Sequence, residues 1–326
     1  MSPSDVPPPK PGASPPAPPS GPIGELDLHL LGEGHHRRLW EVLGPQVVGP
    51  GPAGVSAVQF ALWAPNASNV SVVGDWNDWQ PEPLSMIDAD GPTGIWSAVC
   101  PAARAGHCYK FEIVTAAGQT LRKADPMARQ TELPPSDASV VPSFDDFEWS
   151  DDEWMHRRGE TLAGTAPMRI YEIHLGSWRR SVDDWDGLAR EVGDHVQRLG
   201  FTHVELLPIA EHPFGGSWGY QVSGYFAPTA RFGDPDGLRR FVDTLHARNI
   251  GVIVDWVPAH FPKDEWSLGR FDGTALYEHP DPQRGEHPDW GTYVFDFGRN
   301  EVRNFLVANA LYWFDEFHID GLRVDA

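Results

Sequence analysis

The chain has 326 residues, 40% of them apolar, which is enough for two globular domains and a large core. Its 25 Lys and Arg against 46 Asp and Glu give a net charge of −21, which disfavours nucleic acids and anionic membrane surfaces as partners. The sequence shows neither an apolar run near the roughly 20 residues that span a bilayer nor a signal-peptide pattern at its start, so the cytoplasm is the expected compartment.

The first residues separate into a tail and a lead-in. Residues 1–22 consist mainly of Pro, Ser, Gly and Ala, and this composition cannot bury a core, so we expect a disordered Pro-rich tail. Residues 23–44 carry Leu28, Leu31 and Trp40 at spacings that predict a short helical lead-in.

Residues 45–145 have a different pattern, in which short alternating apolar runs are separated by clusters of Gly, Pro, Asn and Asp. The clearest runs are 58–63, 70–73, 95–99 and 109–114. Strands of this length and spacing predict an antiparallel β-sandwich that forms a separate domain.

The only two cysteines, Cys100 and Cys108, flank an expected hairpin in this domain. A disulfide is geometrically possible there, whereas a reducing compartment favours free thiols, which we expect. Residues 146–167 follow as an acidic connector, and its charges are expected to form a solvated face.

From residue 168 onward, strand-like and helix-like segments alternate. Strands are expected at 169–175, 202–207 and 251–257, with a closing strand that contains residues 322–325. Helices are expected at 185–199, from Asp234-Pro235, and from about Asn300 to Phe317. This alternation predicts a parallel sheet with right-handed crossovers.

Two architectures fit such a sheet. An open doubly wound sheet is possible, but no Gly-rich phosphate loop follows the first strand, so nothing supports nucleotide binding. We expect an α/β (β/α)8 TIM barrel instead, with residues 168–326 as its first four βα units and an insert at about 261–297.

The closing strand carries an ion pair. In a strand, Leu322 and Val324 point to one side and Arg323 and Asp325 to the other, on a face expected to be buried. A neighbouring cation favours the ionised carboxylate, and an ionised, oriented carboxylate can act as a nucleophile. The alternative is a purely structural Arg–Asp pair.

Polar residues also occur on the other three expected strands. Glu172 and His174 share one face of the first strand, His203 and Glu205 share one face of the second, and Asp255 lies in the third. Each alone is explained as a satisfied core group. Four strands that direct charge at one axis indicate a site, because burying unpaired charge costs several kcal/mol.

Two motifs carry a family resemblance. Residues 255–260 (Asp-Trp-Val-Pro-Ala-His) and 321–326 (Gly-Leu-Arg-Val-Asp-Ala) resemble two of the sequence regions that mark the α-amylase superfamily of glycoside hydrolases. Further stretches resemble the glycogen branching enzymes within that superfamily: 171–178, 212–221, 259–264 and 271–279.

The sandwich contains a motif of its own. Residues 73–79 resemble the carbohydrate-binding module that precedes starch- and glycogen-acting enzymes. Trp76 and Trp79 are therefore candidates to stack on glucose rings. The alternative is that both side chains pack the turn against the core of the sandwich.

The superfamily resemblance implies a role for each site residue. Asp325 would attack the anomeric carbon of an α-1,4-linked glucan and form a covalent glycosyl-enzyme, while Arg323 keeps that carboxylate ionised. Tyr220 would stack on the donor sugar, or merely anchor its loop. His260 would bind sugar hydroxyls, and Asp255 would bind Arg323, unless it only caps a helix.

The resemblance also implies the reaction. A retaining double displacement ends in transfer to a 6-hydroxyl, so the expected partner is an α-glucan; no metal or cofactor is expected, and a monomer is favoured. The acid/base glutamate belongs to a later motif, beyond Ala326. We therefore expect the 326 residues alone to be inactive and, with an open sheet edge, poorly soluble.

Two other functions remain open. A debranching or trehalose-releasing hydrolase would share the sandwich and most site residues, although the loop 212–221 and the insert 261–297 favour branching. A non-catalytic glucan-binding protein is the alternative of another class, which the Arg323 and Asp325 pair disfavours.

Overall fold

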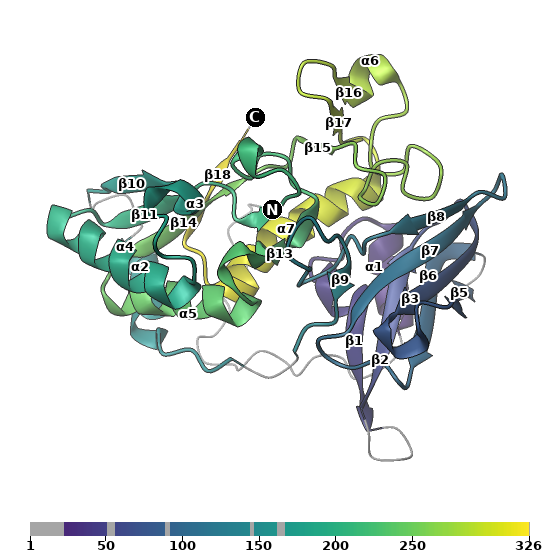
Figure 1. The fold of residues 1–326 in the computed structure, drawn as a ribbon, viewed down its shortest axis with the longest axis horizontal. Helices are drawn as coiled ribbons and strands as arrows, with labels where there is room; N and C mark the ends of the chain where they lie inside the picture. Colours follow the sequence, from purple (N-terminus) through teal and green to yellow (C-terminus); the bar gives the residue numbers. More distant parts are fainter. Residues whose placement is uncertain (1–22, 51–55, 89–91, 144–146, 162–166, 326) are drawn as a thin grey trace, which may run out of the picture.

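The computed structural model describes residues 23–50, 56–88, 92–143, 147–161 and 167–325 (Figure 1). The tail expected at 1–22 lies outside these ranges. The described chain forms a β-sandwich and a parallel sheet with helices, and helix α7 (Asn300–Phe317) runs between them.

The lead-in consists of helix α1 (Glu25–Gly32) and the short turn η1 (Leu39–Glu41), which confirms the expected helical character of this stretch. Trp40 in η1 is almost fully buried, and its Nε1 donates to Glu316 Oε1 of α7 at 3.0 Å. The lead-in is thereby fixed to the helix of the second domain.

The sandwich has two antiparallel sheets. One has the order β1-β2-β6-β5, with β1 (Gly44–Pro50), β2 (Ser56–Trp63), β6 (Pro92–Cys100) and β5 (Ser85–Asp88). The other has β4 (Glu82–Pro83), β3 (Ala67–Gly74), β7 (Cys108–Thr115) and β8 (Thr120–Lys123) in this order, and β9 (Ser139–Val140) pairs with β7.

The four strands expected in the sandwich are confirmed as β2, β3, β6 and β7. Every second side chain of β7 is buried, including Tyr109, Phe111 and Ile113, as the alternating pattern predicts. The other strands were not predicted. Most of them have only two to four residues, too few to show a period.

The expected hairpin between the cysteines is wrong. Cys100 ends β6 in one sheet and Cys108 begins β7 in the other, so the segment between them crosses from sheet to sheet. Both cysteines are free thiols. Burial, with nearby Glu132 and Asp75, raises the pKa of Cys108 to about 11.

The second domain contains a parallel sheet of β10 (Ile170–Ile173), β11 (His203–Leu206), β14 (Gly251–Trp256) and β18 (Gly321–Val324), in this order. Helices α4 (Trp185–Leu199), α5 (Pro235–Ala247) and α7 connect them in turn. In Figure 1, α4 and α5 lie together on one side of these strands. These are the four expected βα units.

Two expected strands are too long. The first ends at Ile173 because helix α3 (Leu175–Trp178) begins directly after His174. Helix α7 continues through Phe317, as expected, and His318 ends it with φ +51°. The closing strand ends at Val324, one residue earlier than expected. Asp325 therefore lies just after the strand and not within it.

Local signals set the helix bounds well. Helix α4 has the expected limits: the Asp184 carboxylate accepts from the Gly187 amide at 2.7 Å at its start, and Gly200 ends it with φ +74°. Helix α5 begins with Asp234 as its cap and Pro235 as its first residue.

The remaining elements lie in two stretches, one after β11 and one after β14. After β11 come β12 (Ala210–Glu211), η3 (Gly215–Ser217), β13 (Gly224–Pro228) and η4 (Ala230–Phe232). The insert after β14 contains β15 (His260–Pro262), α6 (Pro282–Gly285), β16 (Glu286–His287) and β17 (Thr292–Val294). Figure 1 shows the insert rising above α7 beside the sandwich.

The connector contains helix α2 (Asp152–Thr161), and one expectation about it is wrong. Its acidic run is not entirely a solvated face, because the Asp151 side chain is buried and bonded to His246. Asp152 and Glu153 are exposed. None of the helices in the described ranges is long and apolar enough to cross a membrane.

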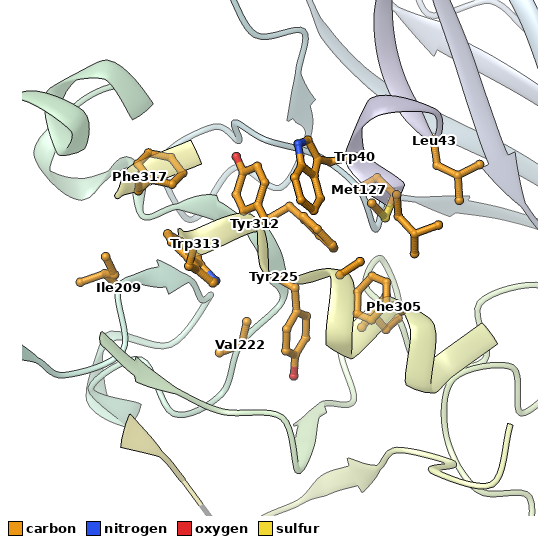
Figure 2. Packing of buried hydrophobic residues seen from close by; sticks show 14 of the residues in the cluster. Trp40, Leu43, Met127, Ile209, Val222, Tyr225, Phe305, Tyr312, Trp313 and Phe317 are labelled. Atoms are coloured by element: carbon orange, nitrogen blue, oxygen red, sulfur yellow. The ribbon is translucent and has the colours of Figure 1, made fainter. Parts of the chain in front are cut away.

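Aromatic residues pack around α7 and join the lead-in to the second domain. The ring of Trp40 lies 5.3 Å from Tyr312 of α7, and Tyr225 of β13 lies 5.6 Å from Phe305 on the same helix. Figure 2 shows these rings together with Leu43 and other buried side chains around α7. Burial of such rings is the main source of stability in this region.

Polar contacts fasten the sandwich to the insert. Lys123 of β8 is buried, and its Nζ donates to the carbonyls of Glu265 at 2.5 Å and Gly269 at 2.7 Å. Asn66 donates from its backbone and its side chain to Asp272 Oδ2. The sandwich thus supports the base of the insert.

Replacing Lys123 by Met is expected to lower the free energy of unfolding by about 2 kcal/mol, since two inward carbonyls lose their charged donor. Arg122→Met is the matched control. Arg122 is the neighbour of Lys123 in the sequence, its side chain is half-exposed, and its ion pair with Glu112 contributes less than about 1 kcal/mol. Chemical denaturation measures both, and equal destabilisation would contradict the role given to Lys123.

Candidate active site

The site lies at the carboxyl ends of the four parallel strands, where barrel enzymes bind their substrates. Glu172 of β10 and Glu205 of β11 are register partners and therefore face the same side of the sheet. The pKa of Glu205 is raised by burial and by the charges of Glu172 and Asp255, against the opposing effect of Arg323. The strands thus direct their charges towards one space, as expected.

Arg323 is the centre of this arrangement. Its Nη1 donates to both carboxylate oxygens of Asp255 at 3.0 Å and to Asp325 Oδ1 at 2.6 Å. The backbone reinforces this contact, because Asp255 and Arg323 are register partners and the Asp325 amide donates to the Trp256 carbonyl at 2.9 Å. The expected bond between Asp255 and Arg323 is confirmed.

The expectation of a buried face on β18 is wrong. The side chain of Arg323 is 45% exposed and that of Asp325 22%, while Asp255 is the buried partner at 3%. Val324 is also exposed. The reason is that β18 is the outer strand of the four in the described sheet, so it has a neighbour on one side only.

Tyr220 completes a chain of bonds. Its hydroxyl donates to Asp255 Oδ2 at 2.6 Å. Burial and this bond raise the pKa of Tyr220 above its ordinary value. Burial also raises the pKa of Asp255, although the bonds from Tyr220 and Arg323 oppose this effect. Asp255 therefore binds two site residues, and the alternative that it caps a helix is wrong.

The loop that carries Tyr220 has a sharp turn just before it. Trp218 and Gly219 both have positive φ, and a Cβ at Gly219 would lie 2.3 Å from the Pro208 carbonyl oxygen. Only glycine fits this close approach. The turn brings the Tyr220 hydroxyl to Asp255 and leaves the Trp218 ring largely exposed.

His260 lies at the start of β15 and is almost fully buried. Burial lowers its pKa, and nearby His287 acts in the same direction, whereas Asp325 opposes both. Its Nδ1 has no hydrogen-bond partner among the described residues. The ring lies 5.2 Å from that of Trp290, which is 55% exposed. A neutral imidazole here can donate to or accept from a hydroxyl.

His174 lies at the carboxyl end of the sheet, whereas His203 begins β11 at the opposite end, so the expectation that His203 faces the site is wrong. His174 follows β10, forms a hydrogen bond with the Ser177 hydroxyl at 2.8 Å and lies 5.8 Å from the Trp218 ring. His203 forms a hydrogen bond with the Thr202 hydroxyl at 2.8 Å. Both therefore fit the simpler explanation of satisfied polar groups, and burial lowers the pKa of each.

The two sandwich tryptophans differ from each other. Trp76, in the turn η2 (Asp75–Asn77), stacks on buried Phe60 at 5.2 Å and donates to Glu82, so it packs against the core. Trp79 is partly exposed and donates to Asp75. Only Trp79 retains a ring that is not stacked on a buried core aromatic.

Two features of the site were not predicted. They are two exposed rings: Trp218 in the loop that carries Tyr220, and Trp290 in the insert. The only sequence signal for their exposure was the neighbouring glycine, Gly219 or Gly291. As for metals, no group of three or more His, Cys, Asp or Glu in the described ranges is arranged to hold an ion.

Two families match the chain. Residues 42–128 match carbohydrate-binding module 48 (isoamylase N-terminal domain), and residues 147–274 match the catalytic domain of α-amylase. The first match falls on the sandwich and the second on the connector and the first three parallel strands.

Curated relatives include proteins named 1,4-alpha-glucan branching enzyme. Those of Frankia casuarinae, Rhodococcus jostii and Nocardia farcinica are 60%, 59% and 58% identical, respectively. Each match covers 93% of this chain and 37%, 41% and 41% of the relative. The chain thus spans about two-fifths of the length of the curated relatives it matches.

Solved structures share the fold. A pullulanase from Paenibacillus barengoltzii is 22% identical with a TM-score of 0.67, over 93% of this chain and 52% of that protein. A putative alpha amylase from Salmonella typhimurium is also 22% identical, with a TM-score of 0.65 over 87% and 43% of the two chains.

Arg323→Met is expected to raise the pKa of Asp255 by about 1 to 3 pH units, because a cation within bonding distance favours the ionised carboxylate. Titration of carboxylate carbon shifts by NMR measures this pKa. Arg190→Met, at an exposed position of α4, should leave it unchanged. An unaltered Asp255 titration in Arg323→Met would show that Arg323 is not its main partner.

Proposed function

We propose that the chain is part of a glucan branching enzyme of the α-amylase superfamily, and that it carries the nucleophile with which such an enzyme cleaves an α-1,4 bond and transfers the chain to a 6-hydroxyl. The observation that carries this proposal is the continuous chain of bonds from Tyr220 through Asp255 and Arg323 to Asp325. It holds one carboxylate in place at the carboxyl end of a barrel strand.

In the first step, the Asp325 carboxylate oxygen forms a bond to the anomeric carbon while the bond to the leaving oxygen breaks. The leaving oxygen takes a proton from a second carboxyl group, which a retaining mechanism places about 5–5.5 Å from the nucleophile. By the family resemblance, that group belongs to a later strand of the barrel.

In the second step, the 6-hydroxyl of an acceptor chain attacks the anomeric carbon. The bond to Asp325 breaks, the carboxylate returns to its ionised form, and the second carboxyl group, now acting as base, takes the hydroxyl proton. The product is an α-1,6 branch, and the reaction consumes no water.

Arg323 and Asp255 prepare the nucleophile. The guanidinium lies 2.6 Å from Asp325 Oδ1, so it stabilises the ionised form that attacks. Asp255 fixes the guanidinium through two bonds, which limits its freedom to turn away. Both residues act on the position and charge of Asp325.

Tyr220 and His260 are proposed to contact the donor sugar. Tyr220 is partly buried and held through its hydroxyl, which fixes the ring that we propose as a platform for the sugar. His260 is neutral at physiological pH because burial lowers its pKa, and it can therefore bond to a sugar hydroxyl. Both positions agree with the roles that the resemblance implies.

Branching is favoured over hydrolysis by the relatives. The curated relatives at 58% to 60% identity are named branching enzymes, whereas the pullulanase structure is 22% identical and supports the fold alone. A purely glucan-binding function is disfavoured because Asp255, Arg323 and Asp325 form a fully bonded set. In the sandwich, Trp79 is the better candidate for glucan contact.

The proposed partner is an α-glucan, and the proposed state of the protein is a monomer. For the compartment we propose the cytoplasm, where thiols such as those of Cys100 and Cys108 stay reduced.

Asp325→Asn is expected to lower branching activity by at least about 1,000-fold, because the amide cannot form the glycosyl intermediate. Asp183→Asn, an exposed aspartate before α4, is the matched control. This loss is measured in a polypeptide extended to the length of the curated relatives, and the 326-residue chain, which is expected to be inactive alone, is assayed beside it. New α-1,6 linkages without new reducing ends support transfer, whereas new reducing ends indicate hydrolysis. Glucan binding without turnover, in both the extended polypeptide and the 326-residue chain, would favour the binding function.

Trp290→Ala is expected to weaken maltoheptaose binding by about tenfold, or about 1.4 kcal/mol, because an exposed ring beside His260 offers a stacking surface. Calorimetric titration of the 326-residue chain measures this without catalysis. Val307→Ala removes an equally exposed apolar side chain from α7 and should not change the affinity. Unchanged binding by Trp290→Ala would remove Trp290 from the glucan site.

A further inference from the structure

A buried histidine lies between two carboxylates at the opposite end of the sheet from the site. His246 Nδ1 is 2.8 Å from Asp151 Oδ2, and His246 Nε2 is 2.9 Å from Asp320 Oδ2. The three side chains are at most 2% exposed. They come from the last turn of α5, the residue before α2 and the residue before β18.

The geometry sets the protonation state of this histidine. A neutral imidazole has one N–H and can donate to only one of two carboxylates, so its other nitrogen would face an oxygen lone pair. An imidazolium donates to both. Burial alone opposes the charged form, but the bonds to Asp151 and Asp320 outweigh it and raise the pKa of His246. The C-terminal end of α5 also favours a cation.

Asp320 joins this cluster to the catalytic strand. Its Oδ2 also accepts from the Val252 amide of β14 at 2.7 Å, and its own amide donates to the Val252 carbonyl at 2.8 Å. It directly precedes β18, whose far end carries Arg323 and Asp325. Asp320 thus fixes the point at which the strand enters the sheet.

The connector supplies the other half of the cluster. Trp154 of α2 stacks on the His246 ring at 5.0 Å and donates from Nε1 to Asp320 Oδ1 at 2.8 Å. Arg158 of the same helix donates to Asp320 Oδ1 at 3.1 Å. Charged and polar contacts therefore hold α2 against the sheet, in addition to this one aromatic stack.

The other charged or titratable groups that face the cluster are few. His318, at the end of α7, bonds to Asp151 at 2.9 Å and stacks on Trp149 at 3.8 Å. His203 of β11 lies near Asp320, and burial lowers its pKa. In this cluster, the two anions Asp151 and Asp320 are paired with the two cations His246 and Arg158.

We propose that His246 is a positioning residue for the reaction: as an imidazolium it bonds α2 to Asp320, and so sets where β18 and its terminal Asp325 lie. This rests on the proposed function, because it takes Asp325 as the reacting group. The bonds to both ring nitrogens, with both carboxylates buried, are the observation that carries it.

The pH dependence has a definite sign. The folded protein binds the proton of His246 more tightly than the unfolded chain does, since the pKa is raised. The stabilisation is therefore complete below about pH 6.5, the ordinary imidazole value, and is lost as the pH rises through the higher value of the folded protein.

The test on the 326-residue chain needs no catalysis. Nitrogen NMR of the wild-type protein at pH 7 should show both His246 ring nitrogens protonated. His246→Gln should lower Tm by about 5 to 10 °C at pH 6.5, with a smaller loss at about pH 9. His156→Gln, at an exposed position of α2, should leave Tm unchanged at both pH values.

The test on the reaction uses the longer polypeptide that contains the chain. His246→Gln is expected to lower kcat by about 10- to 100-fold with little change in KM, because Asp325 is displaced while the sugar contacts remain. Asp151→Asn keeps an acceptor for the ring and serves as a milder second variant if His246→Gln fails to fold; it should lower the pKa of His246 and give a smaller loss of kcat.

One ring nitrogen without a proton at pH 7 would overturn the proposal, and so would an unchanged kcat in both variants of an active enzyme. The proposed function fails separately: a doubly protonated His246 and a pH-dependent Tm difference, in a polypeptide with no glucan activity, would leave the structural cluster in place and remove only its catalytic role.

Discussion

The bond from Arg323 to Asp255 is the constraint on which the site depends. Asp255 is buried, and a buried carboxylate without a cation is costly. The guanidinium that neutralises it comes from the neighbouring strand and also donates to Asp325, so one side chain holds two carboxylates in place. The Tyr220 hydroxyl bonds to the same Asp255, which ties the loop after β12 to the strands.

Strand β18 is held by ionic contacts at both ends. Asp320, which precedes β18, is bonded to His246 and Arg158. At the other end of the strand, Arg323 is bonded to Asp255 and to Asp325. The strand itself has only four residues, of which the first two are partly buried and the last two are exposed. Its position therefore depends on charge, while the stability of the surrounding fold depends on the aromatic core around α7.

The sandwich has a structural part in the site as well as a family resemblance to glucan-binding modules. Lys123 and Asn66 bond to the base of the insert, and the upper part of the same insert carries Trp290 beside His260. Trp76 stacks on the sandwich core. The domain thus supports one wall of the site, and this support does not require it to bind glucan itself.

The sequence by itself determined the features that depend on local chemistry. Helical periodicity and Gly200 predicted α4, and the Asp234-Pro235 pair predicted the start of α5. The four short apolar runs predicted the parallel strands that bring Asp255, Arg323 and Asp325 together. Only the tertiary structure decided that β6 and β7 lie in different sheets, that Arg323 is half-exposed and that Asp151 is buried against His246. Periodicity records which side of an element is apolar, but two polar residues 95 positions apart leave no local mark of their meeting.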